Sequence, residues 1–279
     1  MIKRLKLTNE EFAPDVIMNS GQVFRMYKDG GELTDGIPGV YRALSGSNEV
    51  TFSFDMENDN WCFVCEDGQW DFWNRYFDFD TDYIAFNDCI RKSNDSFLKD
   101  ALGDAFGMRI LRQDLWETFI SYMISQNNNI PKIKKSIQIL CDRYSDGVAF
   151  PTARELAMAG TDQLSKGTML GYRADYISGF AKDVYDGKII LEDYEKKSYD
   201  EAVDALLKVK GVGPKVAACI ALYGLHLMES YPIDTWMKKI IAEDYREYSK
   251  DRYMEYLKSY AGFEGYVQQL QFYHKRLQG

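Results

Sequence analysis

The sequence predicts an α+β protein with a small β-rich N-terminal part, residues 1–107, followed by a larger α-helical part, residues 108–279. Short β-branched and aromatic runs, separated by Asp, Asn and Gly, dominate roughly the first 80 residues. Beyond Asp82, apolar residues recur at helical spacing instead. Neither a low-complexity linker nor an internal repeat interrupts the chain.

Three runs in the N-terminal part have the pattern of strands, at residues 40–44, 49–54 and 61–65. Because turn residues separate them closely, we expect an antiparallel sheet. The last run contains a C-x-x-C formed by Cys62 and Cys65. Strand alternation places these sulfurs on opposite faces, and no second pair completes a zinc site, so we expect both cysteines to be structural.

The helical part begins with an N-terminal capping pattern. Asp114 is followed three positions later by Glu117 and then by apolar residues at core spacing. Further helices are expected at residues 133–144, 153–159, 174–186, 199–209, 215–225, 235–242 and 252–276.

The net charge of −9 argues at first against a polyanionic partner. The charge is uneven, however, because residues 1–107 carry 20 acidic and 10 basic side chains, whereas residues 108–279 carry 23 and 24. A local basic face is compatible with an acidic whole, and the local potential is what a phosphate backbone experiences. Charge alone therefore neither supports nor excludes DNA as a partner.

The remaining composition indicates a cytoplasmic protein. No stretch of about 18 uncharged apolar residues is present, so we expect no membrane span. The basic N-terminus lacks the apolar run of a secretory signal. Five scattered cysteines favour reduced thiols over a disulfide framework.

The segment at about residues 203–225 predicts two helices joined by a tight hairpin. Gly211 and Gly213 permit the turn and would let a phosphate approach the backbone N–H groups, while Pro214 suits the first turn of the second helix. This is the helix-hairpin-helix pattern, a clamp on the DNA backbone that does not read sequence. The G-V-G-P-K form between two apolar helices is more specific than a bare G-x-G.

Lys215 and Asp234 are the candidate catalytic residues. The positive end of a helix disfavours an ammonium group at Lys215 and favours the neutral amine that a lysine nucleophile needs. In isolation, a phosphate-contacting or solvated lysine is the preferred interpretation. Asp234 occupies an expected N-cap position, which alone would explain it. The two residues together suggest catalysis, because a capping carboxylate beside a reactive amine can stabilise a cation that develops on a sugar.

These features resemble the helix-hairpin-helix base-excision glycosylases that use a lysine nucleophile, and further segments are similar to the 8-oxoguanine DNA glycosylases. The resemblance implies an N-terminal antiparallel sheet and two α-helical regions that flank a DNA-binding cleft. It spans nearly the whole chain. The segments that carry it, in family order, are Asn19–Arg25, Arg109–Leu115, Ser125–Ile130, Leu170–Ala174, the hairpin with Lys215, Pro232–Asp234 and the pair Gln268 and Phe272.

The resemblance assigns a base pocket. Gly21 would present its carbonyl to the hydrogen on N7 of 8-oxoguanine, where normal guanine has an acceptor; otherwise Gly21 is a turn glycine. Phe272 and Gln268 lie four residues apart and share a helix face. Phe272 would stack on the extruded base and Gln268 would bond its Watson–Crick edge, although spacing alone favours a core role for Phe272. Cys219 would pack on the other face of the base.

The resemblance also assigns DNA contacts outside the pocket. Asn127, Tyr172 and Arg173 would fill the gap left by the flipped base and contact the orphan base. Asn127 could otherwise be a helix C-cap, and Tyr172 with Arg173 an ordinary surface pair. Gly211 and Gly213 would contact the backbone.

Two positions depart from the family pattern. Animal members carry a second arginine after N-N-N-I, whereas Pro131 and Lys132 follow here, and lysine cannot form a planar two-pronged contact. We therefore expect Lys132 to contact DNA with a weak preference for cytosine opposite the lesion. Trp236 stands where histidine is common, which leaves its expected phosphate contact in doubt.

The implied activity is bifunctional: excision through a lysine Schiff base, followed by nicking through β-elimination. We expect no cofactor and no metal, because the chemistry needs none and the four-cysteine iron–sulfur spacing is absent. The expected partner is double-stranded DNA containing 8-oxoguanine, bound by a monomer, in the cytoplasm or, in a bacterium, at the nucleoid. The alternatives are a glycosylase for another damaged purine and a non-catalytic DNA-binding protein that uses only the hairpin.

Overall fold

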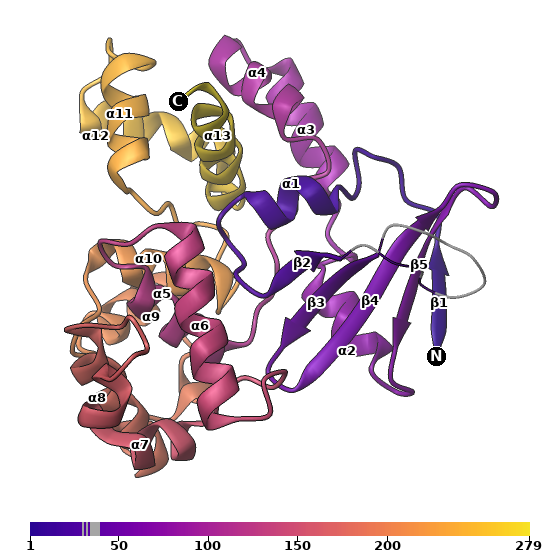
Figure 1. Ribbon diagram of the computed structural model, residues 1–279. Helices are drawn as coiled ribbons and strands as arrows, with labels where there is room; N and C mark the ends of the chain where they lie inside the picture. Colours follow the sequence, from indigo (N-terminus) through magenta and orange to yellow (C-terminus); the bar gives the residue numbers. More distant parts are fainter. Residues whose placement is uncertain (30, 32, 34–39) are drawn as a thin grey trace.

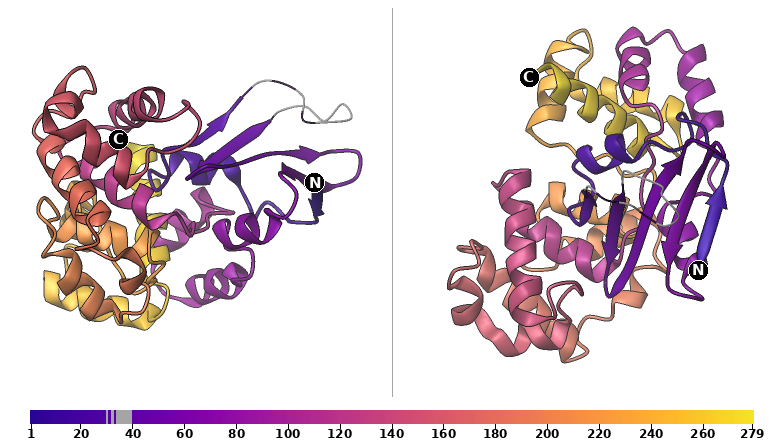
Figure 2. Two further views of the ribbon diagram at one scale, coloured as in Figure 1. Left: turned by 90° about the horizontal axis from the view of Figure 1, so that it is seen from below. Right: turned by 45° about the vertical axis from the view of Figure 1, so that its right-hand side comes forward.

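A computed structural model describes residues 1–29, 31, 33 and 40–279. It places an antiparallel sheet beside a larger body of helices, which confirms the predicted α+β class (Figure 1). Two further views show the sheet at one side of the molecule and the C-terminal helix α13 against the helices α3 and α4 (Figure 2). None of the described helices is both long and apolar enough to cross a bilayer.

In the part of the chain that the structure describes, the sheet has five strands in the order β1-β5-β4-β3-β2, and every neighbouring pair is antiparallel. The three predicted strands correspond to β3, β4 and β5. The two edge strands β1 and β2 were not predicted, because each is too short to show alternation. The strand bounds are β1 Ile2–Leu5, β2 Met26–Lys28, β3 Tyr41–Ser45, β4 Asn48–Asp55 and β5 Asn60–Cys65.

Aromatic rings fill the core beneath the sheet. Phe52 on β4 pairs with Phe63 on β5 in register, and their rings stack at 5.2 Å. Phe12 and Phe77, from outside the sheet, cover them edge-on or tilted. Burial of this many rings holds the sheet against the helices α1 and α2.

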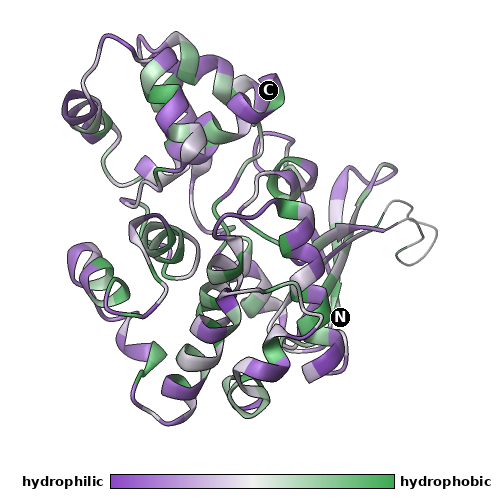
Figure 3. Cartoon of the chain, turned by 60° about the vertical axis from the view of Figure 1, so that its left-hand side comes forward, coloured by the Kyte–Doolittle hydropathy of each residue, from purple (hydrophilic) through white to green (hydrophobic). Residues whose placement is uncertain are grey.

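The helices follow the predicted amphipathic pattern, with hydrophilic and hydrophobic residues alternating along the ribbons (Figure 3). Their bounds are α1 Pro14–Asn19, α2 Trp70–Tyr76, α3 Tyr83–Lys92, α4 Ser96–Asp104, α5 Leu115–Ser125, α6 Ile130–Tyr144, α7 Ala153–Ser165, α8 Arg173–Tyr185, α9 Tyr199–Leu206, α10 Pro214–Tyr223, α11 Thr235–Glu243, α12 Lys250–Leu257 and α13 Glu264–Gln278, with short 3-10 turns η1 Leu191–Asp193 and η2 Lys258–Tyr260.

Asp114 caps α5 as predicted, because its Oδ1 accepts a hydrogen bond from the backbone N–H of Glu117 at 2.7 Å. The Glu117 side chain does not return to the cap. It accepts instead from the backbone N–H of Gly46 at 2.9 Å and lies 3.4 Å from the buried Arg25 guanidinium. Glu117 therefore joins α5 to the turn between β3 and β4.

The predicted helix over residues 252–276 is wrong, because the chain forms two helices there. α12 ends at Leu257, and α13 begins at Glu264. Between them Gly262 has φ +90°, a left-handed conformation that stops a helix, and its N–H donates to the Glu264 carboxylate at 2.8 Å.

α3 and α4 share the helical core rather than the core beneath the sheet. Leu98 and Leu102 of α4 are buried in the same cluster as Val267 and Leu270 of α13. Their packing fixes the orientation of α13, the helix on which two predicted pocket residues lie. The division of the chain at residue 107 stays a prediction.

Candidate active site

A groove of about 710 Å³ lies where three helices begin. Asn129, Gly213 and Asp234 are the N-caps of α6, α10 and α11, and all three line it. Each helix start exposes unpaired N–H groups and carries a partial positive charge. The groove is also lined by three basic side chains, Lys215, Lys238 and Arg276, which outnumber the acidic Asp234. An acidic chain thus has a locally positive surface suited to phosphates.

The predicted hairpin joins α9 to α10. Gly211 has φ +87°, and a Cβ there would lie 2.5 Å from the Tyr176 ring. Gly213 differs, because its φ is −93° and no heavy atom of the described residues outside its two chain neighbours lies within 4 Å of the position a Cβ would take. The Gln126 amide donates to the Gly211 carbonyl at 3.0 Å and ties the loop to the end of α5. Pro214 is the first residue of α10, as predicted.

A small cavity opens from the groove. Its volume is about 40 Å³, close to the space of one water molecule. A purine would therefore enter only after side chains move. The residues that line both the cavity and the groove are Gly21, Tyr122, Lys215, Asp234 and Phe272, and those that line the cavity alone are Ser20, Cys219, Tyr223, Pro232, Gln268 and Gln269.

Lys215 is half-buried at the second position of α10. Its Nζ lies 5.3 Å from the centre of the Tyr122 ring. It also lies beside the thiol of Cys219, whose pKa is raised by burial and lowered in part by this lysine. No ion pair joins Lys215 to Asp234 among the described residues, which leaves the amine near the carboxylate without being held by it.

Asp234 is the N-cap of α11, as predicted, and its Oδ1 accepts from the Met237 N–H at 2.9 Å. Capping fixes the carboxylate at the mouth of the cavity. Two helix starts therefore hold Lys215 and Asp234 on the wall of one pocket, although 18 residues separate the two positions in the chain.

Gln268 and Phe272 share the cavity face of α13, as their spacing predicted. Gln268 is 4% exposed, and its Oε1 has no hydrogen-bond partner in the part of the chain that the structure describes. A buried acceptor without a partner costs free energy unless a ligand satisfies it. Phe272 is half-buried, with the Arg276 guanidinium 5.4 Å from its ring centre.

Gly21 has φ +82°, so glycine is required on conformational grounds. The chain bends at Gly21, between α1 and β2. Gly21 also lines the cavity, and a Cβ there would lie 3.5 Å from the Phe272 ring and 3.4 Å from Ile130.

Asn127 and Tyr172 are exposed and lie together, with the Asn127 Nδ2 3.5 Å from the Tyr172 hydroxyl. The C-cap of α5 is Gln126 rather than Asn127, and Asn127 follows it with φ +47°. Arg173 is only 8% exposed, and its guanidinium donates to the carbonyls of Gln126, Asn127 and Leu170. It braces this loop from within.

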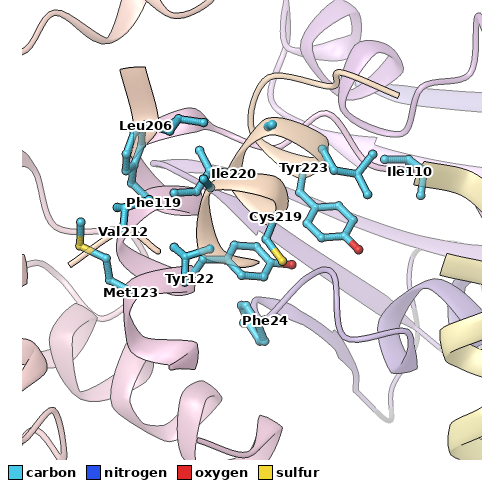
Figure 4. Close-up of a cluster of buried hydrophobic side chains, with 14 of the residues drawn as sticks. Phe24, Ile110, Phe119, Tyr122, Met123, Leu206, Val212, Cys219, Ile220 and Tyr223 are labelled. Carbon is cyan, nitrogen blue, oxygen red and sulfur yellow. The ribbon is translucent and has the colours of Figure 1, made fainter. Parts of the chain in front are cut away.

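Lys132 is exposed on α6 but is not among the residues that line the groove, whereas Trp236 is. Sequence reasoning did not select Tyr122, Tyr223 and Gln269, because each lies in an apolar helical pattern that indicates core. Tyr122 and Tyr223 in fact stack at 5.4 Å beside Cys219 (Figure 4). The one available signal was the spacing of Tyr223, one turn beyond Cys219.

All five cysteines carry free thiols. Across residues 1–29, 31, 33 and 40–279, no group of three His, Cys, Asp or Glu side chains is placed to hold a metal ion.

A lysine on a hairpin, beside a buried recess and a groove lined by helix starts, is the arrangement typical of helix-hairpin-helix DNA glycosylases. Residues 4–119 match the family model described as the N-terminal domain of 8-oxoguanine DNA glycosylase. The chain is 30% identical to the N-glycosylase/DNA lyase OGG1 of Arabidopsis thaliana, over 85% of this chain and 67% of that protein. It is 34% identical to the N-glycosylase/DNA lyase of Saccharomyces cerevisiae, over 55% of this chain but only 46%, about half, of that protein.

Solved structures of similar proteins share the fold of this chain. The 8-oxoguanine glycosylase/lyase of Clostridium acetobutylicum, bound to double-stranded DNA with cytosine opposite the lesion, superposes with a TM-score of 0.84 at 28% identity, over 100% of this chain and 98% of that one. A complex of MBOgg1 with a low-affinity DNA ligand gives 0.85 at 30% identity, over 100% and 99%. The chain belongs to the 8-oxoguanine DNA glycosylase family.

Proposed function

We propose that the protein removes 8-oxoguanine from duplex DNA and then nicks the strand, with Lys215 as nucleophile. The observation that carries this proposal is the cavity lined by Lys215, Asp234 and Gln268, at the wall of a groove built from helix starts. Among the described residues, the Gln268 Oε1 has no hydrogen-bond partner. The family supports both activities, because its named members are N-glycosylase/DNA lyases.

Binding begins at the groove. The hairpin presents backbone N–H groups to a phosphate, and the open space at Gly213 admits close approach. Asn127 and Tyr172 are the exposed groups that enter the gap left by the extruded nucleotide. Gly211 shapes the hairpin, and Trp236 adds a backbone contact from the lining of the groove.

Recognition takes place in the cavity. The Gly21 carbonyl accepts the hydrogen that 8-oxoguanine carries on N7, and the same carbonyl repels the N7 acceptor of guanine. Gln268 supplies polar contacts to the Watson–Crick edge, which satisfies its buried Oε1. Phe272 moves aside to admit the base and then stacks on one face, while Cys219 packs against the other.

The chemistry then proceeds at the sugar. The Lys215 amine forms a bond to C1′ while the bond from C1′ to the base breaks, and the base leaves with the electron pair and takes a proton. The Asp234 carboxylate stabilises the positive charge that develops on the sugar. Ring opening leaves a Schiff base, and loss of a C2′ proton expels the 3′ phosphate, which nicks the strand.

The protein discriminates only weakly among bases opposite the lesion. The donors of Arg173 are engaged with loop carbonyls, and Lys132 lies outside the groove lining. Neither offers the planar fork that reads one base edge. Because one chain supplies hairpin, pocket and nucleophile, we propose that it acts as a monomer on chromosomal DNA in the cytoplasm or nucleoid, without a cofactor.

Borohydride trapping on a duplex with a single 8-oxoguanine tests the function. The native protein should form a covalent adduct, Lys215→Gln should lose it, and Lys210→Gln, which removes another amine of the hairpin, should keep it. Release of the base without an adduct would make the enzyme monofunctional. Release of an alkylated purine but not of 8-oxoguanine would reassign the lesion, and binding without release of any base would leave a non-catalytic clamp.

A further inference from the structure

The loop that carries Gly21 is held by buried neutral side chains on both sides. Gln269 of α13 lies one residue beyond Gln268, is 1% exposed and faces the same cavity. Its Nε2 donates to the Ser20 carbonyl at 2.8 Å, and its Oε1 accepts from the Tyr223 hydroxyl. One amide therefore links α13, α10 and the peptide plane that enters Gly21.

The peptide plane that leaves Gly21 is fixed separately. The N–H of Gln22 donates to the Ser20 Oγ at 3.4 Å. The Gln22 carbonyl accepts from the Gln113 amide at 2.8 Å and from the Tyr122 hydroxyl at 3.2 Å. The Gln22 side chain bonds the backbone on either side of Ile110, as donor to Arg109 and acceptor from Leu111. Gly21, at φ +82°, thus connects the Ser20–Gly21 and Gly21–Gln22 peptide planes, each of which has a hydrogen-bond partner.

We propose that Gln269 is a positioning residue that sets discrimination between 8-oxoguanine and guanine, by fixing the Ser20–Gly21 peptide and hence the direction of the Gly21 carbonyl. This role rests on the proposed function, because it assumes that the carbonyl meets N7 of the flipped base. The Gly21 carbonyl shares a peptide plane with the Gln22 N–H, and that plane is held by the 3.4 Å bond from this N–H to the Ser20 Oγ. Glycine has wide conformational freedom, so this plane keeps its direction only if Ser20 is itself held in place. The bond from Gln269 to the Ser20 carbonyl anchors Ser20.

The choice of an amide has a physical reason. Ser20 offers only a carbonyl and Tyr223 offers a hydroxyl donor, so the residue between them must donate on one side and accept on the other. Both partners of Gln269 are neutral, so this linkage adds no charge to the cavity that holds Lys215 and Asp234. An apolar substitute would leave two buried groups without partners.

Substitution of Gln269 should harm base recognition selectively. A preformed abasic site has no base and needs no Gly21 carbonyl, so nicking there reports on Lys215 and Asp234 alone. Gln269→Leu should slow single-turnover excision of 8-oxoguanine about tenfold or more while nicking at an abasic site falls far less. Placed in the Lys215→Gln background, where neither duplex is cleaved, it should also reduce the affinity ratio between 8-oxoguanine and guanine duplexes about tenfold.

Gln271→Leu is the matched control. Gln271 lies on the same helix, is fully buried and makes three hydrogen bonds to tyrosines, but it does not line the cavity. The Gln271→Leu substitution should change excision of 8-oxoguanine and nicking at an abasic site by the same factor. If Gln269→Leu does not fold, Gln269→Glu tests the same bond, because it keeps the acceptor for Tyr223 and removes the donor to Ser20.

If the Gln269 variants lose excision of 8-oxoguanine and nicking at an abasic site by the same factor, as expected for Gln271→Leu, then Gln269 has only a structural role. An unchanged affinity ratio would overturn the inference as well. These outcomes are distinct from failure of the proposed function, in which the native protein itself would neither excise 8-oxoguanine nor form an adduct.

Discussion

Gly211→Ala should lower stability, whereas Gly213→Ala should leave stability unchanged and weaken DNA binding, although the two glycines lie two residues apart in one hairpin. Alanine at position 211 must adopt φ +87°, which costs about 1–2 kcal/mol. Its Cβ would also lie 2.5 Å from the Tyr176 ring, and such overpacking costs about 1–3 kcal/mol more. Together these effects should lower the free energy of unfolding by about 2–5 kcal/mol.

Position 213 has neither problem. Its φ of −93° suits any residue, and a Cβ there would have no heavy atom within 4 Å. Gly213→Ala should therefore leave the free energy of unfolding within about 0.5 kcal/mol of the native value. It should nevertheless weaken DNA binding, because the added methyl group occupies the space through which a phosphate approaches the hairpin.

Urea unfolding and fluorescence anisotropy with a labelled duplex measure the two quantities separately. In a Tyr176→Ala background, Gly211→Ala should cost only the backbone contribution of about 1–2 kcal/mol. Equal urea midpoints for native protein and Gly211→Ala would refute the steric reasoning. Undiminished affinity in Gly213→Ala would refute the view that the hairpin approaches phosphate at this position.

Three further predictions concern pH, salt and the orphan base. Burial alone would raise the pKa of Asp78, but bonds from His226 and Arg112 outweigh burial and lower it to about 2. Asp78→Asn should therefore lose about 2 kcal/mol of stability at pH 7 in urea titrations, and the difference should vanish as pH falls from about 4 through 2; a constant difference would contradict the assignment. Lys238→Ala should reduce the salt dependence of duplex affinity by about one unit of slope, and an unchanged slope would exclude a phosphate contact. Excision rates opposite cytosine and adenine should differ by less than about tenfold, since the fork-shaped contact worth about 1–3 kcal/mol is missing; a steep cytosine preference would show that Arg173 leaves its loop carbonyls on binding DNA.

Local patterns could be predicted from the sequence, and contacts between distant segments could not. The hairpin, Pro214 at the start of α10 and the capping role of Asp234 all depend on a few adjacent residues, and all were predicted correctly. The break between α12 and α13 was not predicted, because the amphipathic pattern continues on both sides of residues 258–263 and hides the interruption.

The candidate site shows the same division. The placement of Gln268 and Phe272 on one helix face follows from their spacing, so it was predictable. The partners of Gln269 come from α10 and from a loop near the N-terminus, and no periodicity links them. The burial of Arg173 was not predictable, because a guanidinium that folds onto loop carbonyls has the same sequence context as one that faces solvent.

The acidic composition shows why a charge count could not decide the partner. Formal charge ignores backbone dipoles, yet the groove is bordered by the N-terminal ends of α6, α10 and α11. Each end offers unpaired N–H groups whose effective charge is about half a proton and falls off within one turn. Three such ends act only on a phosphate that reaches the groove, while the excess of acidic residues in the first 107 positions repels DNA elsewhere on the surface. Net negative charge is therefore compatible with DNA binding here, and it favours engagement through the groove over indiscriminate adhesion to the duplex.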